Sequence, residues 1–141
     1  MKSNRIGLMM ALALILMPAS APAAEVGLDY DVYKNQVEPI FLKKRPTHGR
    51  CYACHAESNN AFRLEKLSPG ISTWSEEQSQ SNFQKVSALV VAGEPDKSKF
   101  LLHPLAPEAG GQAFHSGGRQ FASKNDPDWK ILTQWVRGQS K

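Results

Sequence analysis

Both cysteines of the chain lie in one short stretch, GRCYACHAE, at residues 49–57. Cys51 and Cys54 are separated by two residues, and His55 follows the second cysteine directly. Two thiols and an imidazole in this order can hold a metal ion, form a redox-active pair, or attach a haem group covalently. Because disulfides and thiols behave differently inside and outside the cytoplasm, the compartment of the chain bears on the choice.

The N-terminus has the features of a secretory signal. Two basic residues precede an apolar run of twelve residues, 6–17, and an Ala-Pro-Ala tripeptide follows it. The run is shorter than the roughly 20 residues that a membrane-spanning helix needs. We therefore expect residues 1–23 to be a signal peptide that is cleaved after Ala23, with an uncleaved anchor as the alternative. An exported chain of this kind is expected in the periplasm.

Residues 24–141 have the size of one domain. Loss of Lys2 and Arg5 with the signal lowers the formal net charge from +4 to +2, which does not favour a nucleic-acid partner. We also expect no stable membrane insertion after cleavage. The longest basic run, Lys43-Lys44-Arg45, is interpreted as a solvated helix end, with a docking patch for an acidic redox partner as the alternative.

Apolar spacing and capping residues predict about four helical segments and almost no strand. A long segment rich in glycine and proline, residues 94–126, is expected to hold at most one helical turn near 98–102 and to pack on a cofactor. The three tryptophans are expected in the core. The expected helices are 31–42 with a bend at Pro39, 61–67, the stretch from the capping box Ser75/Gln78 to Gly93, and the stretch from the cap Asp126 to Gly138.

In an exported chain, C-x-x-C-H is typical of a c-type haem attachment site. The thiols of Cys51 and Cys54 can each add to a vinyl group of the haem, and His55 can then bind the iron as the proximal ligand. A structural disulfide, a thioredoxin-like pair and a zinc site are the alternatives. A disulfide between Cys51 and Cys54 would close too small a loop to stabilise much. A thioredoxin-like pair needs strands that the sequence does not predict, and the histidines that a zinc site would need are scattered.

Four motifs spread over most of residues 24–141 carry a family resemblance: Pro39-Ile40-Phe41, the C-x-x-C-H, the stretch 93–102 (GEPDKSKFLL), and Trp135-Val136-Arg137-Gly138. In these the chain resembles class I-like monohaem cytochrome c domains, most closely those of planctomycete and acidobacterium type. The resemblance implies a small, mostly α fold around one covalent haem. It also implies that the first and last helices cross near the haem edge and that the long loop carries the distal ligand.

The distal ligand cannot be the methionine that most class I domains use. All four methionines lie within residues 1–17 and would leave with the signal. His115, in the sequence AFHSGGRQF, stands where such domains present their distal ligand and is the favoured candidate. His103 is the second candidate and His48 a weaker one; a lysine ligand or an open iron remains possible.

Histidine on both sides of the iron would leave no free position for a substrate, which favours electron transfer over catalysis. We therefore expect an exported electron carrier that works with redox partner proteins of unknown identity. The alternatives are a haem-based gas sensor or small peroxidase-like enzyme with an open distal site, and a subunit of a larger respiratory complex. The residues considered as partners of the haem propionates are Arg50, Arg119 and Lys124.

Overall fold

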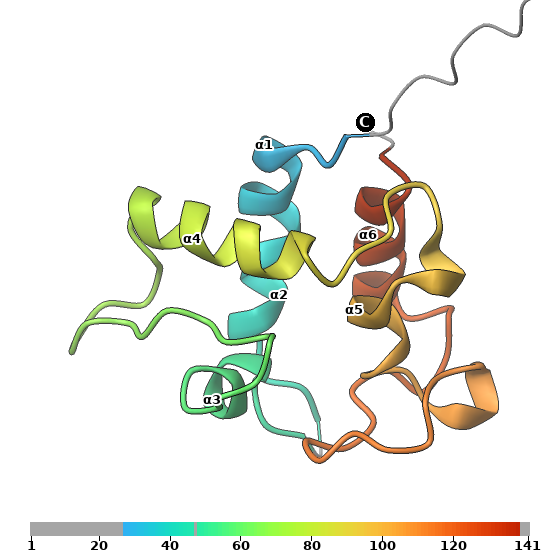
Figure 1. The fold of residues 1–141 in the computed structure, drawn as a ribbon. Coiled ribbons are helices and arrows are strands. Elements are labelled where there is room, and N and C mark those ends of the chain that lie inside the picture. The colour runs from blue at the N-terminus through green and yellow to red at the C-terminus, as the bar shows by residue number, and fades with distance from the viewer. Residues whose placement is uncertain (1–26, 47, 139–141) are drawn as a thin grey trace, which may run out of the picture.

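The computed structural model describes residues 27–46 and 48–138, and this part of the chain is mostly helical with no β-strand. The expectation of a mostly α fold is confirmed at this level. The predicted signal peptide lies outside the described residues. Figure 1 shows α4 lying across the first helix, with α6 beside that helix and α3 below it.

The first helix runs through residues 30–42 in three parts, α1 (Tyr30–Val32), η1 (Tyr33–Val37) and α2 (Glu38–Leu42). The middle part is a π-helical turn, in which the N–H of Glu38 donates to the carbonyl of Tyr33. Pro39 follows directly. A proline in a helix removes one N–H and crowds the carbonyl four residues earlier, and a wider turn relieves that crowding. The predicted irregularity at Pro39 is therefore present as a π turn within one continuous helix.

Helix α4 (Glu76–Ser87) begins at the predicted capping box, with Ser75 and Gln78 bonding each other's backbone N–H. The prediction that it extends to Gly93 was wrong, because the helix ends at Ser87. The hydroxyl of Ser98 accepts a hydrogen bond from the N–H of Val91 and donates to backbone carbonyls there. That bonding gives the chain after α4 a non-helical course.

The expected helix at 61–67 is not formed. Its backbone N–H groups bond to distant acceptors instead of to a helical ladder. The N–H of Leu64 donates to the carbonyl of His55, that of Glu65 to Asn82 Oδ1, and that of Leu67 to the hydroxyl of Tyr52. This irregular segment therefore ties α3 (Cys51–His55) to α4.

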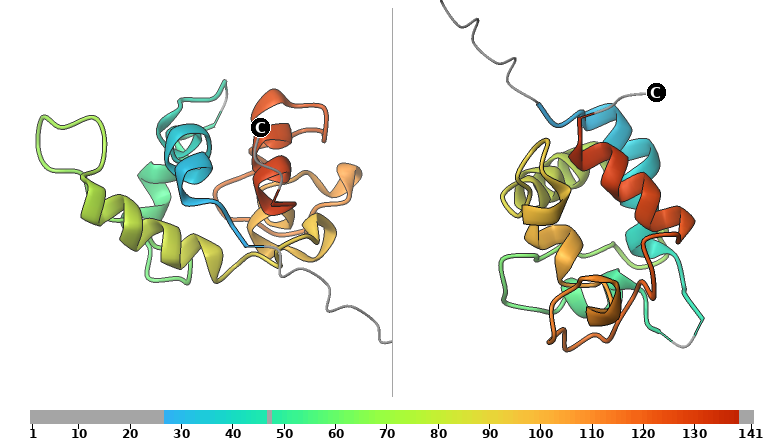
Figure 2. Two further views of the ribbon diagram at one scale, coloured as in Figure 1. Left: turned by 90° about the horizontal axis from the view of Figure 1, so that it is seen from above. Right: turned by 90° about the vertical axis from the view of Figure 1, so that its right-hand side faces the viewer.

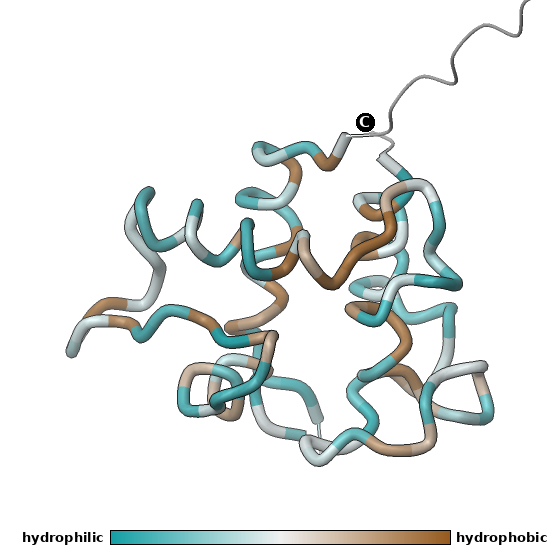
Figure 3. The backbone as a smooth tube through the Cα atoms, in the orientation of Figure 1, coloured by the Kyte–Doolittle hydropathy of each residue, from teal (hydrophilic) through white to brown (hydrophobic). Residues whose placement is uncertain are grey.

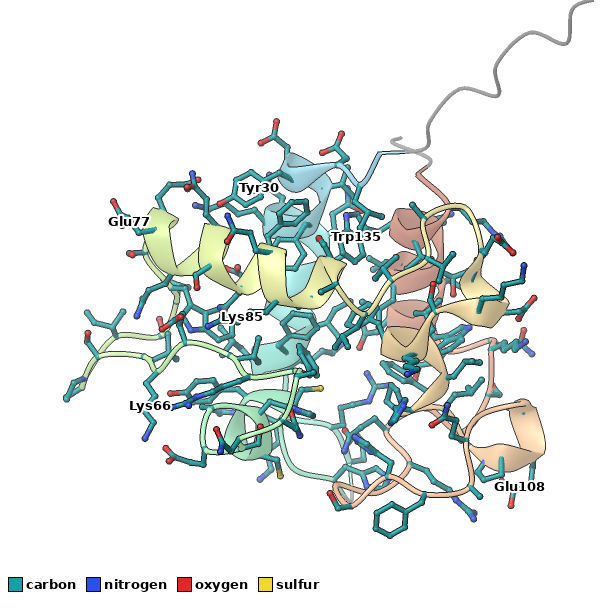
Figure 4. All side chains as sticks on the ribbon, viewed as in Figure 1. Tyr30, Lys66, Glu77, Lys85, Glu108 and Trp135 are labelled. Carbon is teal, nitrogen blue, oxygen red and sulfur yellow. The ribbon has the colours of Figure 1, made fainter. Side chains whose placement is uncertain are left out.

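Helix α6 (Pro127–Val136) has the predicted cap at Asp126, and its apolar stripe is buried as expected. It crosses the first helix, as the right-hand view of Figure 2 shows. At the crossing the ring of Trp135 lies 5.5 Å from the ring of Tyr33. The labelled Trp135 and Tyr30 lie at the same end of the molecule in Figure 4. All three tryptophans are buried, which confirms the prediction that they belong to the core.

The hydrophobic segment after α4 runs toward α6 (Figure 3), and the N–H of Gly93 donates to the carbonyl of Val136. The long segment that follows contains short helical turns, η2 (Pro95–Lys97), α5 (Lys99–Leu102) and η3 (Pro107–Ala109). Leu101, Leu105 and Phe121 anchor it in the core. Its later part reaches toward α3, since the ring centroid of His115 lies 6.2 Å from that of His55. The fold thus brings the C-x-x-C-H and the long loop together.

One carboxylate is buried between the first helix and α4. Glu38 is 6% exposed and accepts a hydrogen bond from the Ser79 hydroxyl at 2.9 Å, while its other oxygen has no partner among the described residues. Burial raises the pKa of Glu38 above its ordinary value of 4.5, and the charge of Glu76 adds to this. The Ser79 bond and the charge of Lys34 oppose the rise.

We predict that Glu38→Gln raises the free energy of unfolding at pH 7. A raised pKa means that the folded state binds the Glu38 proton more tightly than the unfolded state, so ionisation at higher pH costs stability. Glutamine keeps an acceptor for Ser79 and carries no charge. The gain should shrink as pH falls through the raised pKa of Glu38 and vanish below the ordinary value of 4.5. Urea unfolding followed by circular dichroism at pH 7 and pH 4 measures both effects.

Glu77→Gln is the matched control on α4. This exposed residue lies in the first turn of the helix, where hydrogen bonds from its own backbone N–H and from Ser75 lower its pKa. Removing its charge should therefore slightly lower stability at pH 7. A Glu38→Gln protein less stable than wild type at pH 7 would contradict the account of the buried carboxylate.

Candidate functional site

The two thiols lie on α3, which begins after the extended residue Arg50. Their sulfur atoms are the yellow atoms beside α3 in Figure 4. Both cysteines are free thiols in this structure, with Cys51 partly buried and Cys54 exposed. Burial raises the pKa of the Cys51 thiol to about 11. The two sulfurs thus differ in how accessible they are.

The ring of His55 is fixed by a backbone carbonyl. Its Nδ1 lies 2.7 Å from the carbonyl oxygen of Phe62, whose ring centroid is 4.2 Å from that of the imidazole. Because a carbonyl can only accept, Nδ1 carries the proton of the neutral ring and Nε2 carries the lone pair. Burial lowers the pKa of His55, and the proximity of His115 lowers it further. The neutral form, which can bind a metal, is therefore favoured.

His115 is held in the same way by its own loop. Its Nδ1 lies 2.6 Å from the carbonyl oxygen of Gly118, and the N–H of Gly118 donates to the carbonyl of His115. Gly118 has a φ of +80°, a conformation that side-chain-bearing residues rarely adopt. A Cβ at Gly117 would come within 3.3 Å of the imidazole ring. The two glycines thus let the turn close tightly on the ring.

The structure brings these two imidazoles together although they are sixty positions apart in the sequence. Their ring centroids are 6.2 Å apart, and their planes are inclined by 19°. With each Nδ1 bonded to a carbonyl, each ring has Nε2 as its lone-pair nitrogen. This pair is the central geometric feature of the site.

Around the pair lies a cavity of about 620 Å³, within the range of roughly 300–1,000 Å³ that is typical of cofactor pockets. Its walls are largely apolar and come from the first helix, α3, α5, the long loop and α6. Residues that shape it include Cys51, Cys54, Phe41, Phe62, Phe100 and Leu132. Phe62 and Phe100 were not predicted as site residues, since only the folded chain shows which apolar side chains face the cavity.

The other candidate residues occupy different positions. His103 is exposed and contributes to the cavity wall; partial burial lowers its pKa, and His115 lowers it further. His48 is half-buried beside Gly118 and is not among the residues that line the cavity. Arg119 pairs with Glu108, and Lys124 pairs with Asp96, at 3.1 Å each. Arg50 lies in the cavity wall.

The interpretation of the basic run as a solvated helix end was wrong for Arg45. This residue is 9% exposed and forms ion pairs with Asp126 and Asp128 at the start of α6. Its guanidinium also lies 4.4 Å from the centroid of the Phe121 ring, which lines the cavity. Lys43 is exposed but donates to Asp128. Because these partners lie more than 75 positions away, the local pattern of charges could not reveal them.

Among known family models, curated proteins and solved structures, none matches this chain. Within residues 27–46 and 48–138, no three or more His, Cys, Asp and Glu side chains gather as ligands of one ion. In the same part of the chain, no helix has the length and apolar character that crossing a membrane requires. The candidate site is therefore argued from its own geometry.

We predict that Arg45→Met lowers the free energy of unfolding by about 1.5–3 kcal/mol, because Asp126 loses its cation and Asp128 keeps only the ammonium of Lys43. Asp128 is only 10% exposed at its side chain. Urea unfolding at neutral pH measures the loss.

Lys44→Met, at an exposed neighbouring position, is the control and should change stability by less than about 0.5 kcal/mol. The double variant Arg45→Met/Asp128→Asn should lose less than the sum of the single losses, since the two residues interact. If Arg45→Met is as stable as the control, Arg45 does not anchor α6.

Proposed function

We propose that this chain is an exported monohaem c-type cytochrome that transfers electrons. Cys51 and Cys54 would attach the haem through thioether bonds, with His55 as the proximal and His115 as the distal iron ligand. The observation that carries the proposal is the pair of imidazoles beside the two thiols, 6.2 Å apart and nearly parallel.

The spacing of the two rings suits a single metal ion between them. A bond between a metal and an imidazole nitrogen is about 2 Å long. The nitrogen itself lies about 1 Å from the centre of a five-membered ring with partial double bonds. Two histidines on opposite sides of one ion should therefore have centroids about 6 Å apart, close to the spacing in this chain.

The hydrogen bonds of the two rings support the same assignment. Metal-binding histidines usually donate their second ring N–H to a carbonyl or carboxylate, which fixes the tautomer and orients the lone pair toward the metal. His55 and His115 both do so, through Phe62 and Gly118. A histidine with a purely structural role would not need a second histidine, bonded in the same way through Nδ1, at this distance across a cavity.

Two axial nitrogens are a sufficient protein contribution when a macrocycle supplies the remaining ligands. This accounts for a site with two facing histidines and without a larger ligand cluster in the described part of the chain. When bound, haem supplies an iron that alternates between the ferrous and ferric states. The chain excludes water with the apolar wall formed by Phe41, Phe62 and Phe100, and it holds the two imidazoles in place.

The sensor or peroxidase-like alternative needs room for a small molecule between the iron and a distal base. A hydrogen bond from such a molecule to the base spans a further 2.7–3.2 Å or so. The spacing of His55 and His115 is shorter than that arrangement requires. For His103, which lies exposed in the cavity wall, the alternative remains open and is addressed by the experiment below.

A role restricted to a larger respiratory complex would be favoured by an exposed apolar patch at residues 101–107. Leu101, Leu105 and Ala106 are instead buried within this chain. The burial of these three apolar side chains does not favour such a role, and we propose a separate carrier. Its export to the periplasm is proposed from the N-terminal sequence alone, and its redox partners remain to be identified by co-purification.

We predict that the reduced, haem-loaded protein takes up CO only slowly, whereas a His115→Ala variant takes it up rapidly. CO needs a vacant axial position, which the loss of the distal imidazole would provide. Optical spectra under CO measure uptake. His103→Ala is the matched control and should remain closed, because this histidine is not the proposed ligand.

Haem should also stay with the polypeptide under denaturing conditions and be lost from it in the Cys51→Ala/Cys54→Ala variant. Ready CO uptake by wild type would contradict the two-histidine assignment and favour the sensor or enzyme alternative. If His103→Ala takes up CO readily and His115→Ala does not, the distal ligand is His103 and not His115. A chain that attaches no haem would overturn the proposal.

A further inference from the structure

Gln120 is a buried polar residue in the cavity wall that the proposed function does not use. It is 7% exposed, and its side-chain Nε2 donates to the carbonyl of Gly117 at 2.9 Å. Most of the polar side chains in this loop are exposed. A buried amide in the wall of the cavity therefore needs an explanation.

The bond from Gln120 closes a turn around His115. Within that turn, His115 Nδ1 bonds the carbonyl of Gly118, and the N–H of Gly118 bonds the carbonyl of His115. Gln120 adds a third bond, to the carbonyl of Gly117, which directly precedes Gly118 in the sequence. The side chain of Gln120, which lies outside the turn 115–118, thus holds that turn through the Gly117 carbonyl.

Gln120 is in turn fixed by its neighbour. The N–H of Phe121 donates to the carbonyl of Pro104, the carbonyl of Phe121 accepts from Ala106, and the Phe121 ring lies under the guanidinium of Arg45. The backbone at 120–121 is therefore a firm base, whereas the turn at 115–118 has two glycines and an exposed neighbour, Phe114. The Gln120 amide therefore connects the anchored backbone at 120–121 to the glycine-containing turn that carries His115.

The amide makes this bond at a cost. Its other polar atom, Oε1, is buried and has no hydrogen-bond partner among the described residues. A buried acceptor without a partner lowers stability. An apolar residue of similar size would avoid that cost, so stability alone does not account for a glutamine at this position.

We infer that Gln120 is a positioning residue for His115, which keeps the distal imidazole in the cavity and so sets how readily the distal position opens. The inference rests on the proposed function, because it concerns the same pair of histidines. Gln120 acts through the Gly117 carbonyl and not on the iron itself. Its loss should free the turn without unfolding the protein.

The test uses the haem-loaded, reduced protein and its Gln120→Leu variant, with CO as the probe. Leucine fills a similar volume but cannot donate to Gly117. The CO association rate should rise at least about fivefold, the change that corresponds to the net contribution of one hydrogen bond. The thermal midpoint should stay near that of wild type, because the unpartnered acceptor is removed together with the bond.

Two control variants separate positioning from general loosening. Gln112→Leu changes an exposed glutamine of the same loop and should leave the CO rate unchanged. Val86→Ala makes a hole in the core on α4, away from the cavity wall, and should lower the thermal midpoint without opening the distal site.

An unchanged CO rate in Gln120→Leu would overturn the inference and leave the proposed function intact. An equal rise in Val86→Ala would also overturn it, since opening would then follow stability alone. Rapid CO uptake by wild type, or absence of haem, would overturn the proposed function and this inference with it.

Discussion

The arrangement of the site depends on two imidazoles whose Nδ1 atoms are each bonded to a backbone carbonyl. That bond fixes both the orientation of the ring and the nitrogen that carries the lone pair. For His55 the carbonyl comes from Phe62, seven residues further on, and for His115 it comes from Gly118, three residues further on. Each ring is therefore oriented by residues close to it in the sequence. The fold then brings His55 and His115 to the wall of the same cavity.

The contacts that place His55 at the cavity differ from those that place His115 there. On the side of His55, irregular backbone between α3 and α4 donates its N–H groups to Tyr52, Asn82 and His55 itself. On the side of His115, the loop rests on Phe121, and Arg45 holds Phe121 and the start of α6 together. Arg45 also belongs to the segment that leads into α3. A buried ion pair thus connects the two halves of the site, and it does so at the edge of the cavity.

Features that depend on neighbouring residues could be predicted from the sequence. The capping box at Ser75, the cap at Asp126 and the irregularity at Pro39 all follow from interactions within a few residues. The end of α4, the non-helical course of 61–67 and the burial of Arg45 could not be predicted. Each depends on a partner distant in sequence, such as the Asn82 side chain or the Asp128 carboxylate. The motif indicated Cys51, Cys54 and His55, and the family resemblance indicated His115, but only the folded chain gives the 6.2 Å between the two ring centroids.

Electron paramagnetic resonance of the oxidised, haem-loaded protein tests the central claim most directly. Two neutral imidazoles on one ferric iron give a low-spin signal, and their nearly parallel planes, inclined by 19°, should make that signal rhombic. The account predicts this signal in wild type and its replacement by a high-spin signal in His115→Ala. A high-spin signal in wild type would contradict the proposed pairing of His55 with His115.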